Sequence, residues 1–254
     1  MSQVAHADPL KTLPPVAECV KRALQAQSNP ENLEASQAVE IEYQVRLAYE
    51  RILVRKEQIG ISREVQGHFE KAVTNAEKKF EEGEGDVTQG ALTKLKLGLA
   101  GTLNDITQFQ SDIALARLDL EGLMDTRIDP GFEMADDSLS PREFPFSTLD
   151  AYREKAEGSG KTWREVSPER RISLEKSMVR VNQARSQFNL ARKNRKMTRA
   201  LLVTEVANYD FGIGDEKDLF ETLIIYTRVL VGFYDALYNF DSAVAEFEKE
   251  YLKR

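Results

Sequence analysis

An apolar repeat in the C-terminal part of the chain leaves few choices of fold. From Leu219 to Phe247, large apolar residues recur at alternating spacings of four and three. A repeat of about 3.5 residues places them on one stripe of a helix and favours a left-handed supercoil against neighbouring helices. The stripe comprises Leu219, Leu223, Tyr226, Leu230, Phe233, Leu237, Phe240, Val244 and Phe247. We interpret it as the core-facing side of a long helix, not as a cofactor site.

Long helical patterns also fill most of the remaining sequence. Helices are predicted over residues 34–82, 87–124, 148–157 and 167–209, and a further helix follows Asp215 to the C-terminus. Clusters of glycine or proline separate them, as expected for turns and loops. Alternating apolar and polar residues, the pattern of a half-buried strand, are essentially absent. The predicted fold class is therefore all-α, with long antiparallel α-hairpins that form coiled-coil or helical-barrel segments and little or no β-structure.

Capping residues mark two of the predicted helix starts. Ser167 is expected to cap the helix that begins at Pro168, because proline is tolerated at the first helical position. Asp86 and Thr88 are alternative caps for the helix after the first glycine-rich break.

The sequence also repeats itself. A shift of 129 positions places Phe80–Asp86 on Tyr209–Asp215, so that two glycine-containing breaks of similar sequence coincide. The same shift aligns the ends of the two helices that follow these breaks, which indicates a duplicated hairpin. The predicted organisation is an N-terminal extension (1–33), a first hairpin repeat (34–126), an irregular connector with a short helix (127–166) and a second hairpin repeat (167–254).

Composition excludes several classes of function. The net charge of −7 argues against a nucleic-acid partner, which would normally require a basic surplus. Cys19 is the single cysteine, and His6 and His68 are the two histidines, so neither a cysteine cluster nor a histidine-based metal site or catalytic triad is expected. No nucleophile–base constellation stands out. We therefore expect no catalytic residues, no metal, no cofactor and no enzymatic activity.

Neither a transmembrane helix nor an intact secretory signal is predicted. No stretch of about 18 apolar residues occurs, and Arg228 interrupts the nearest candidate. The first residues have neither a cationic segment nor an apolar one, both of which a signal peptide needs.

Several motifs, in this order, resemble the TolC-like outer-membrane efflux protein family. An aromatic residue before Gly-x-Gly-Asp is followed by a long heptad helix, and the first such helix ends in Ala114–Leu118. Leu149–Tyr152 resembles the opening of the family's second repeat, and Tyr234–Glu248 resembles its closing helix. The resemblance covers roughly residues 38–252.

One departure from the family pattern affects the predicted role. Family members carry a β-hairpin in each repeat, and three chains together close an outer-membrane barrel. Here Val181–Arg199 is expected to run straight from the early helix into the late one. A spanning strand needs about 9 to 11 alternating residues, and none is found. The chain therefore resembles the periplasmic helical part, either as a natural relative without the barrel or as a shortened form.

The resemblance implies where partners would bind. The hairpin turns correspond to the family's periplasmic tips, which open the channel and meet the adaptor of an inner-membrane pump. Asp218 and Glu221 correspond to acidic residues that ring the closed entrance, although ordinary capping and stabilisation of the helix dipole explain them equally well. The implied assembly is a homotrimer at the periplasm or outer membrane. The tip residues are Gly83, Gly85, Asp86, Gly212, Gly214 and Asp215.

The implied function is a passive export conduit for efflux or type I secretion. The alternative is a helical scaffold without a barrel, which would use the same hairpins to bind proteins without transporting anything. A basic run on the third long helix is interpreted as a solvated face, with attraction to anionic lipid headgroups as its functional alternative. It consists of Arg192, Lys193, Arg195, Lys196 and Arg199.

Overall fold

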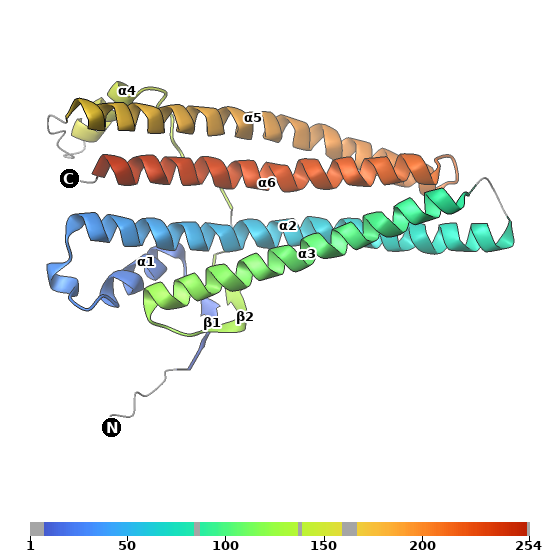
Figure 1. The fold of residues 1–254 in the computed structure, drawn as a ribbon, viewed down its shortest axis with the longest axis horizontal. Coiled ribbons are helices and arrows are strands. Elements are labelled where there is room, and N and C mark those ends of the chain that lie inside the picture. Colours follow the sequence, from blue (N-terminus) through green and yellow to red (C-terminus); the bar gives the residue numbers. More distant parts are fainter. Residues whose placement is uncertain (1–7, 84–86, 137–138, 159–166, 253–254) are drawn as a thin grey trace. The chain divides into compact units, whose positions relative to one another are not determined.

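The computed structural model describes residues 8–83, 87–136, 139–158 and 167–252. Long helices dominate this part of the chain, which confirms the predicted all-α class with little strand (Figure 1). Helices α2 and α3 form one hairpin, and α5 and α6 form the second. The elements in chain order are β1 (Leu10–Leu13), α1 (Val16–Gln25), the 3-10 helix η1 (Pro30–Asn32), α2 (Ala35–Glu82), α3 (Gln89–Met124), β2 (Ile128–Met134), α4 (Leu149–Gly158), α5 (Pro168–Asp210) and α6 (Glu216–Leu252).

The helix ends follow the expected capping chemistry. The Ser167 hydroxyl accepts a hydrogen bond from the backbone N–H of Arg170 at 3.3 Å, and Pro168 is the first residue of α5. The Thr88 hydroxyl accepts a 3.1 Å hydrogen bond from the N–H of Ala91 and so caps α3. Of the two caps that the sequence allowed, Asp86 and Thr88, Thr88 therefore makes a capping bond. Helix α5 continues without a break through residues 181–199, which confirms the uninterrupted helix predicted there.

The structure contains a small parallel sheet that the sequence did not predict. Strand β1 pairs with β2, with Leu10 opposite Ile128 and Thr12 opposite Glu133. Between these two pairs the register shifts, and the extra residues of β2 there include Pro130 and Gly131. Proline and glycine indicate a loop when read from sequence, but they are tolerated in a strand at a bulge. The segment predicted to be an irregular connector therefore contributes a strand to the N-terminal extension.

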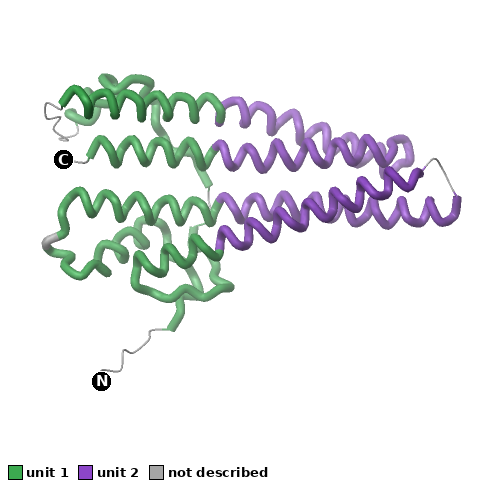
Figure 2. The backbone as a smooth tube through the Cα atoms, in the orientation of Figure 1, with its two compact units in different colours: residues 1–53, 114–187, 237–254 green, residues 54–113, 188–236 purple. Residues whose placement is uncertain are grey.

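The chain divides into two compact units that cut across both hairpins (Figure 2). Unit 1 consists of residues 1–53, 114–187 and 237–254, and unit 2 consists of residues 54–113 and 188–236. Unit 2 holds both hairpin turns. Among the helices that the structure describes, none is long and apolar enough to span a membrane.

Unit 1 is built on an aromatic cluster. Phe144, Tyr152 and Phe247 pack with ring centroids 4.9–5.6 Å apart, in stacked and edge-on arrangements that aromatic pairs favour. Beside them, the carboxyl of Asp241 is buried and accepts a 2.8 Å hydrogen bond from the backbone N–H of Arg142. The Arg142 guanidinium forms an ion pair with Glu50 at 2.9 Å. Burial raises the pKa of Asp241 to about 7, despite the opposing effect of Arg142.

The apolar stripe of α6 is buried at every predicted position from Leu219 to Phe247. A second stripe with the same spacing runs along α3 from Leu92 to Leu123, and it is buried apart from Leu99, Ile113 and Leu123, which are half-buried. The heptad pattern therefore identified the core-facing sides of both helices correctly.

Polar side chains link the helices of unit 2 in successive layers. In the first layer Arg55 on α2 pairs with Asp112 on α3 at 2.7 Å and with Asp235 on α6 at 3.0 Å. In a second layer Glu64 on α2 accepts a hydrogen bond from the Tyr226 hydroxyl at 2.8 Å. Arg199 on α5 donates to that same hydroxyl at 2.6 Å. These layers lie beside the apolar stripe and connect α2 with α3, α5 and α6.

Part of the basic run on α5 contributes to this packing. The Arg195 guanidinium lies 4.7 Å from the centre of the Phe233 ring, within cation–π range. Lys193 and Lys196 are exposed. The run therefore combines a solvated face with arginines that pack α5 against α6.

Candidate functional site

The turn between α2 and α3 contains the first group of predicted tip residues. Gly83 has a backbone φ of 67°, a left-handed conformation that side chains other than glycine adopt at a cost. Gly85 and Asp86 lie outside the described residues. The chain is described again from Val87, and Thr88 caps the following helix.

The turn between α5 and α6 has the hydrogen bonds of a Schellman motif. The N–H of Gly212 donates to the carbonyl of Tyr209 at 3.1 Å, and the N–H of Ile213 donates to the carbonyl of Asn208 at 2.9 Å. This pairing requires a left-handed residue just beyond the helix, and Gly212 has a φ of 71°. The backbone conformation therefore explains the glycine at this position, as predicted for a tight turn between helices.

Gly214 and Asp215 complete the second turn. A Cβ atom on Gly214 would lie 3.2 Å from both the Cβ of Asn208 and the backbone nitrogen of Tyr209, so the chain approaches the end of α5 closely here. The Asp215 carboxylate accepts a 2.8 Å hydrogen bond from the N–H of Asp218 and thereby caps α6. The tip aspartate thus has a structural role that accounts for its position.

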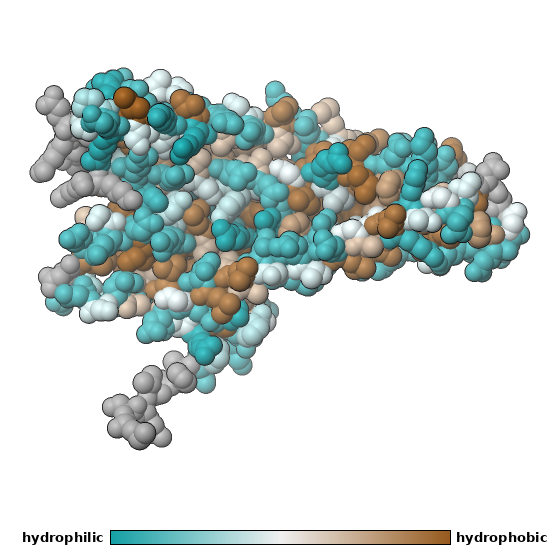
Figure 3. Space-filling view, in the orientation of Figure 1, coloured by the Kyte–Doolittle hydropathy of each residue, from teal (hydrophilic) through white to brown (hydrophobic). Residues whose placement is uncertain are grey.

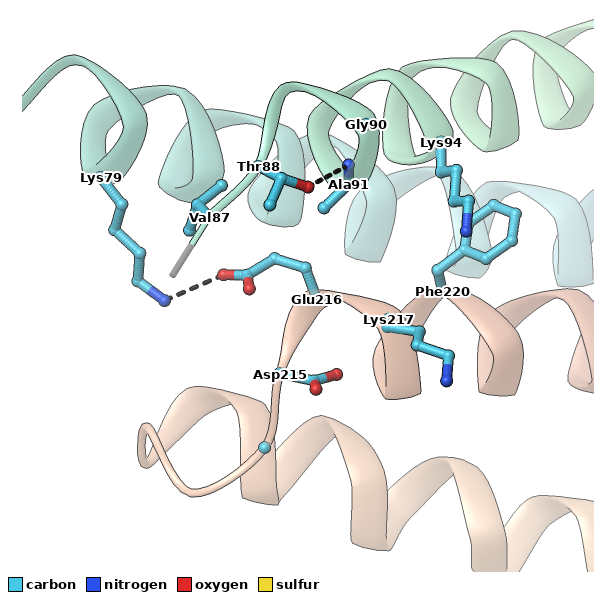
Figure 4. A pocket seen from close by; sticks show the side chains of 11 residues that line it. Lys79, Val87, Thr88, Gly90, Ala91, Lys94, Asp215, Glu216, Lys217 and Phe220 are labelled. Atoms are coloured by element: carbon cyan, nitrogen blue, oxygen red, sulfur yellow. Dashed lines mark hydrogen bonds and ion pairs between the residues drawn. The ribbon is translucent and has the colours of Figure 1, made fainter. Parts of the chain in front are cut away.

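A cleft of about 680 Å³ lies where the start of α3, the start of α6 and the end of α2 meet in unit 2 (Figure 4). Lys79 and Glu216 extend toward each other and form an ion pair at 3.0 Å (Figure 4). The Glu216 side chain is largely buried, so this pair connects the two hairpins near their turns. The cleft is lined by Lys79, Val87, Thr88, Gly90, Ala91, Lys94, Gly214, Asp215, Glu216, Lys217 and Phe220.

Tyr209, at the end of α5, packs against the lysine of this ion pair. Its ring centre lies 5.5 Å from the Lys79 ammonium, and the ring is buried. Burial, together with the negative charge of Glu216, raises the pKa of Tyr209 to about 12, so the phenol is neutral at physiological pH. The three residues form one packed contact between the two hairpins.

The two predicted entrance residues lie on the exposed side of α6. Asp218 and Glu221 are both exposed and stand three residues apart, in the first turns of the helix. At the corresponding positions of the first hairpin, Gln89 is exposed and uncharged and Leu92 is buried. The assignment of Asp218 and Glu221 to an acidic ring stays a prediction.

Two residues of the second turn were not singled out from the sequence. Phe211 and Ile213 are 80% and 78% exposed, more than any other large apolar residue that the structure describes. The repeat alignment held a signal for them, because the equivalent positions of the first turn are Glu82 and Glu84. An apolar residue in place of a glutamate at an exposed turn indicates a different role for the second tip.

Within the described residues, no group of three or more His, Cys, Asp and Glu side chains could hold a metal ion. The candidate site consists of the described turn residues and the cleft where α2, α3 and α6 meet.

Comparison with known proteins identifies the fold. No protein-family model matches the sequence, and no curated protein matches it. Solved structures of outer-membrane channels do match, each over 93% of the chain: CusC (TM-score 0.63, 11% identity), CmeC of Campylobacter jejuni (0.66, 10%) and OprN (0.63, 12%). The chain spans 74%, 65% and 70% of their respective lengths. The chain thus has the TolC-like fold of these channels, as its motifs predicted.

Proposed function

We propose that the protein is a component of a TolC-like export conduit at the outer membrane. The observation that carries this proposal is the fold match to three outer-membrane channels over 93% of the chain. In this proposal the hairpin tips dock a periplasmic adaptor protein, which connects the conduit to an inner-membrane pump. The conduit is passive, so substrate passes through it without covalent chemistry.

Exposed apolar side chains on the long helices support assembly from several copies. In unit 2, Leu97 on α3 is 66% exposed, and Leu190 and Met197 on α5 are similarly open to solvent. Figure 3 shows apolar residues lying between polar ones on the visible face. Packing against α3 and α5 of further copies would remove this surface from water, and each fully covered side chain would contribute about 1.5–3 kcal/mol. The proposed assembly is a homotrimer.

The acidic residues at the start of α6 fit the entrance of such a conduit. In a trimer, Asp218 and Glu221 would form two stacked rings that favour cations and disfavour anions. Their replacement by alanine is expected to increase leak conductance through the assembled conduit. Unchanged conductance would leave them with helix-dipole stabilisation alone.

Replacing one glycine tests whether the tips dock an adaptor. Gly212→Val places a β-branched residue at a φ of 71°, which strains the turn. We expect weaker binding to the purified adaptor of the same organism, with the oligomeric mass unchanged. Gly232→Val is the matched control, because Gly232 is an exposed helical residue in the same unit and a Cβ atom added there would have nothing within 4 Å.

Unchanged adaptor affinity in Gly212→Val would contradict docking through this tip. A monomeric protein that binds partners through its hairpins would instead favour the scaffold without transport.

A further inference from the structure

Residues 139–147 of unit 1 form a strap between β2 and α4 that contains neither helix nor strand. Its end next to α4 is fastened to α5. The Arg185 guanidinium donates hydrogen bonds to the carbonyl of Phe144 at 2.8 Å and to the carbonyl of Phe146 at 2.6 Å. Because arginine stays protonated at any physiological pH, this fastening does not depend on pH.

The start of the strap is fastened by acidic side chains instead. Asp241 on α6 is only 2% exposed, and it accepts a 2.8 Å hydrogen bond from the backbone N–H of Arg142. The Arg142 guanidinium lies 2.9 Å from the carboxylate of Glu50 on α2 and 3.6 Å from that of Glu248 on α6. One residue of the strap thus contacts both helices through three carboxyl groups, and all of these residues belong to unit 1 (Figure 2).

The charges of this cluster do not balance. Its three carboxyls carry three negative charges when all are ionised, whereas the Arg142 guanidinium carries one positive charge. Glu50 Oε2 and Arg142 Nε are both buried without a hydrogen-bond partner among the described residues. Uncompensated charge is costly in such a site, so one carboxyl favours its neutral form. Asp241 is the most deeply buried of the three, and burial, together with the charge of Glu50, raises its pKa to about 7.

Other titratable side chains nearby do not compensate this charge. Arg46 and Lys249 line the adjoining cavity of about 190 Å³, but Arg46 pairs with Glu42 at 2.8 Å. Lys249 pairs with Glu40 at 3.5 Å. Burial raises the pKa of Tyr152 on α4, so this phenol stays neutral. The protonation of the buried aspartate therefore sets the net charge around the start of the strap.

We infer that the start of the strap is a pH-sensitive latch, which is closed while Asp241 is neutral and loosens when Asp241 ionises. In the loosened state residues 139–143 leave α2 and α6, whereas residues 144–147 stay bound to Arg185. This regulation is independent of the proposed export role.

The direction of the switch follows from the two environments of Asp241. In the closed state the carboxyl is buried and has a pKa of about 7. In the loosened state it meets water, and its pKa returns to about 4, the usual value for aspartate. The closed state therefore binds the proton more tightly. Its advantage is fully present below about pH 4 and is lost as the pH rises through 7.

Hydrogen exchange of the full chain, followed by mass spectrometry, tests the latch. Asp241→Asn removes the ionisable carboxyl but keeps an oxygen that can accept the bond from Arg142. The two proteins share the sequence of the strap, so the intrinsic exchange rate cancels in the ratio of wild-type to variant rates. For residues 139–143 this ratio should rise about tenfold between pH 6 and 8, because ionisation favours the loosened state. An unchanged or falling ratio would overturn the latch.

Glu143→Gln is the matched control within the strap. It removes an exposed acidic side chain one position from Arg142 and leaves Asp241 in place. The variant should keep the pH dependence of the wild-type protein. Loss of that dependence would assign the effect to the general charge of the strap, and this would overturn the role of Asp241.

The second half of the strap provides a test that needs no variant. The intrinsic exchange rates of residues 139–143 and 144–147 change with pH in parallel, so their ratio in the wild-type protein reports local opening. Exchange of the first half relative to the second should rise between pH 6 and 8. Equal increases in both halves would indicate unfolding of the whole strap and would overturn a latch at its start.

Discussion

Packing between the two hairpins of unit 2 depends on a glycine in the middle of α3. A Cβ atom on Gly98 would lie 2.5 and 2.6 Å from two ring atoms of Phe69 on α2, and 3.2 Å from the ring of Phe220 on α6. Favourable carbon–carbon contacts are about 3.5–4.0 Å. Phe69 is fully buried and cannot swing into solvent, so Gly98→Ala forces helix α3 or the Phe69 ring to move.

The magnitude follows from two opposing effects. Overpacking a core by one carbon costs about 1–3 kcal/mol. Alanine in a helix interior is more favourable than glycine by about 0.5–1 kcal/mol. The expected net result for Gly98→Ala is a loss of about 1–2 kcal/mol in the free energy of unfolding.

Gly101→Ala is the matched control on the same helix. Gly101 is exposed, and nothing lies within 4 Å of its added carbon, so this variant gains the helix preference without the clash. Thermal unfolding followed by far-UV circular dichroism should separate the two variants by roughly 3–12 °C. Their free energies of unfolding differ by about 1.5–3 kcal/mol, and about 1 kcal/mol shifts the midpoint by 2–4 °C at this size. Equal stability of the two variants would refute the close approach of α3 to Phe69.

Two further predictions concern charged side chains, the partly exposed Arg55 and the buried Asp241. Arg55→Met leaves its two partner aspartates without their cation. It should lower the free energy of unfolding, measured by urea denaturation, by about 1.5–3 kcal/mol. Arg171→Met is the control, because it removes only an exposed ion pair and should leave stability unchanged. The Asp241 carboxyl has a pKa raised to about 7 by burial, whereas in the unfolded chain it is near 4, as is usual for aspartate. The folded state therefore holds this proton more tightly, and the stability it contributes is present below about pH 4 and lost as the pH rises toward 7. The unfolding midpoint should therefore fall between pH 4 and 7, and Asp241→Asn should reduce this fall. The same pH profile in the variant would contradict the raised pKa of Asp241.

Local sequence patterns determined much of the helical architecture. Heptad spacing identified the buried stripe of α6, and Ser167 with Pro168 identified the start of α5, because both signals arise from residues within one helix. Gly212 was also explained correctly, since its conformation is set by the hydrogen bonds of its own turn.

Features that depend on distant segments could not be predicted in the same way. Strand β1 has four residues and pairs with a strand more than a hundred positions later, so its own sequence carries little signal. The fit of Gly98 against Phe69 likewise depends on how α2 and α3 meet, which the heptad pattern does not specify. The repeat pattern also did not predict compact units that cut across both hairpins, and the boundaries it proposed at 1–33, 34–126, 127–166 and 167–254 stay a prediction.

The positions of the turns were predicted, whereas the role of the tip residues in binding stays a prediction. Gly83, Gly212 and Gly214 lie at the two hairpin turns with Asp215. The ion pair between Lys79 and Glu216 depends on the spatial arrangement of both hairpins, which the sequence does not specify. The exposure of Phe211 was missed because an aromatic residue next to a helix end usually suggests packing.

The absolute mass of the protein in solution tests the central claim most directly. Light scattering after gel filtration measures this mass without assuming a shape. The conduit account predicts an assembly of three times the 28.8 kDa of one chain, held together by the exposed apolar faces of α3 and α5. A stable monomer at concentrations well above the micromolar range would contradict that account and favour a helical scaffold.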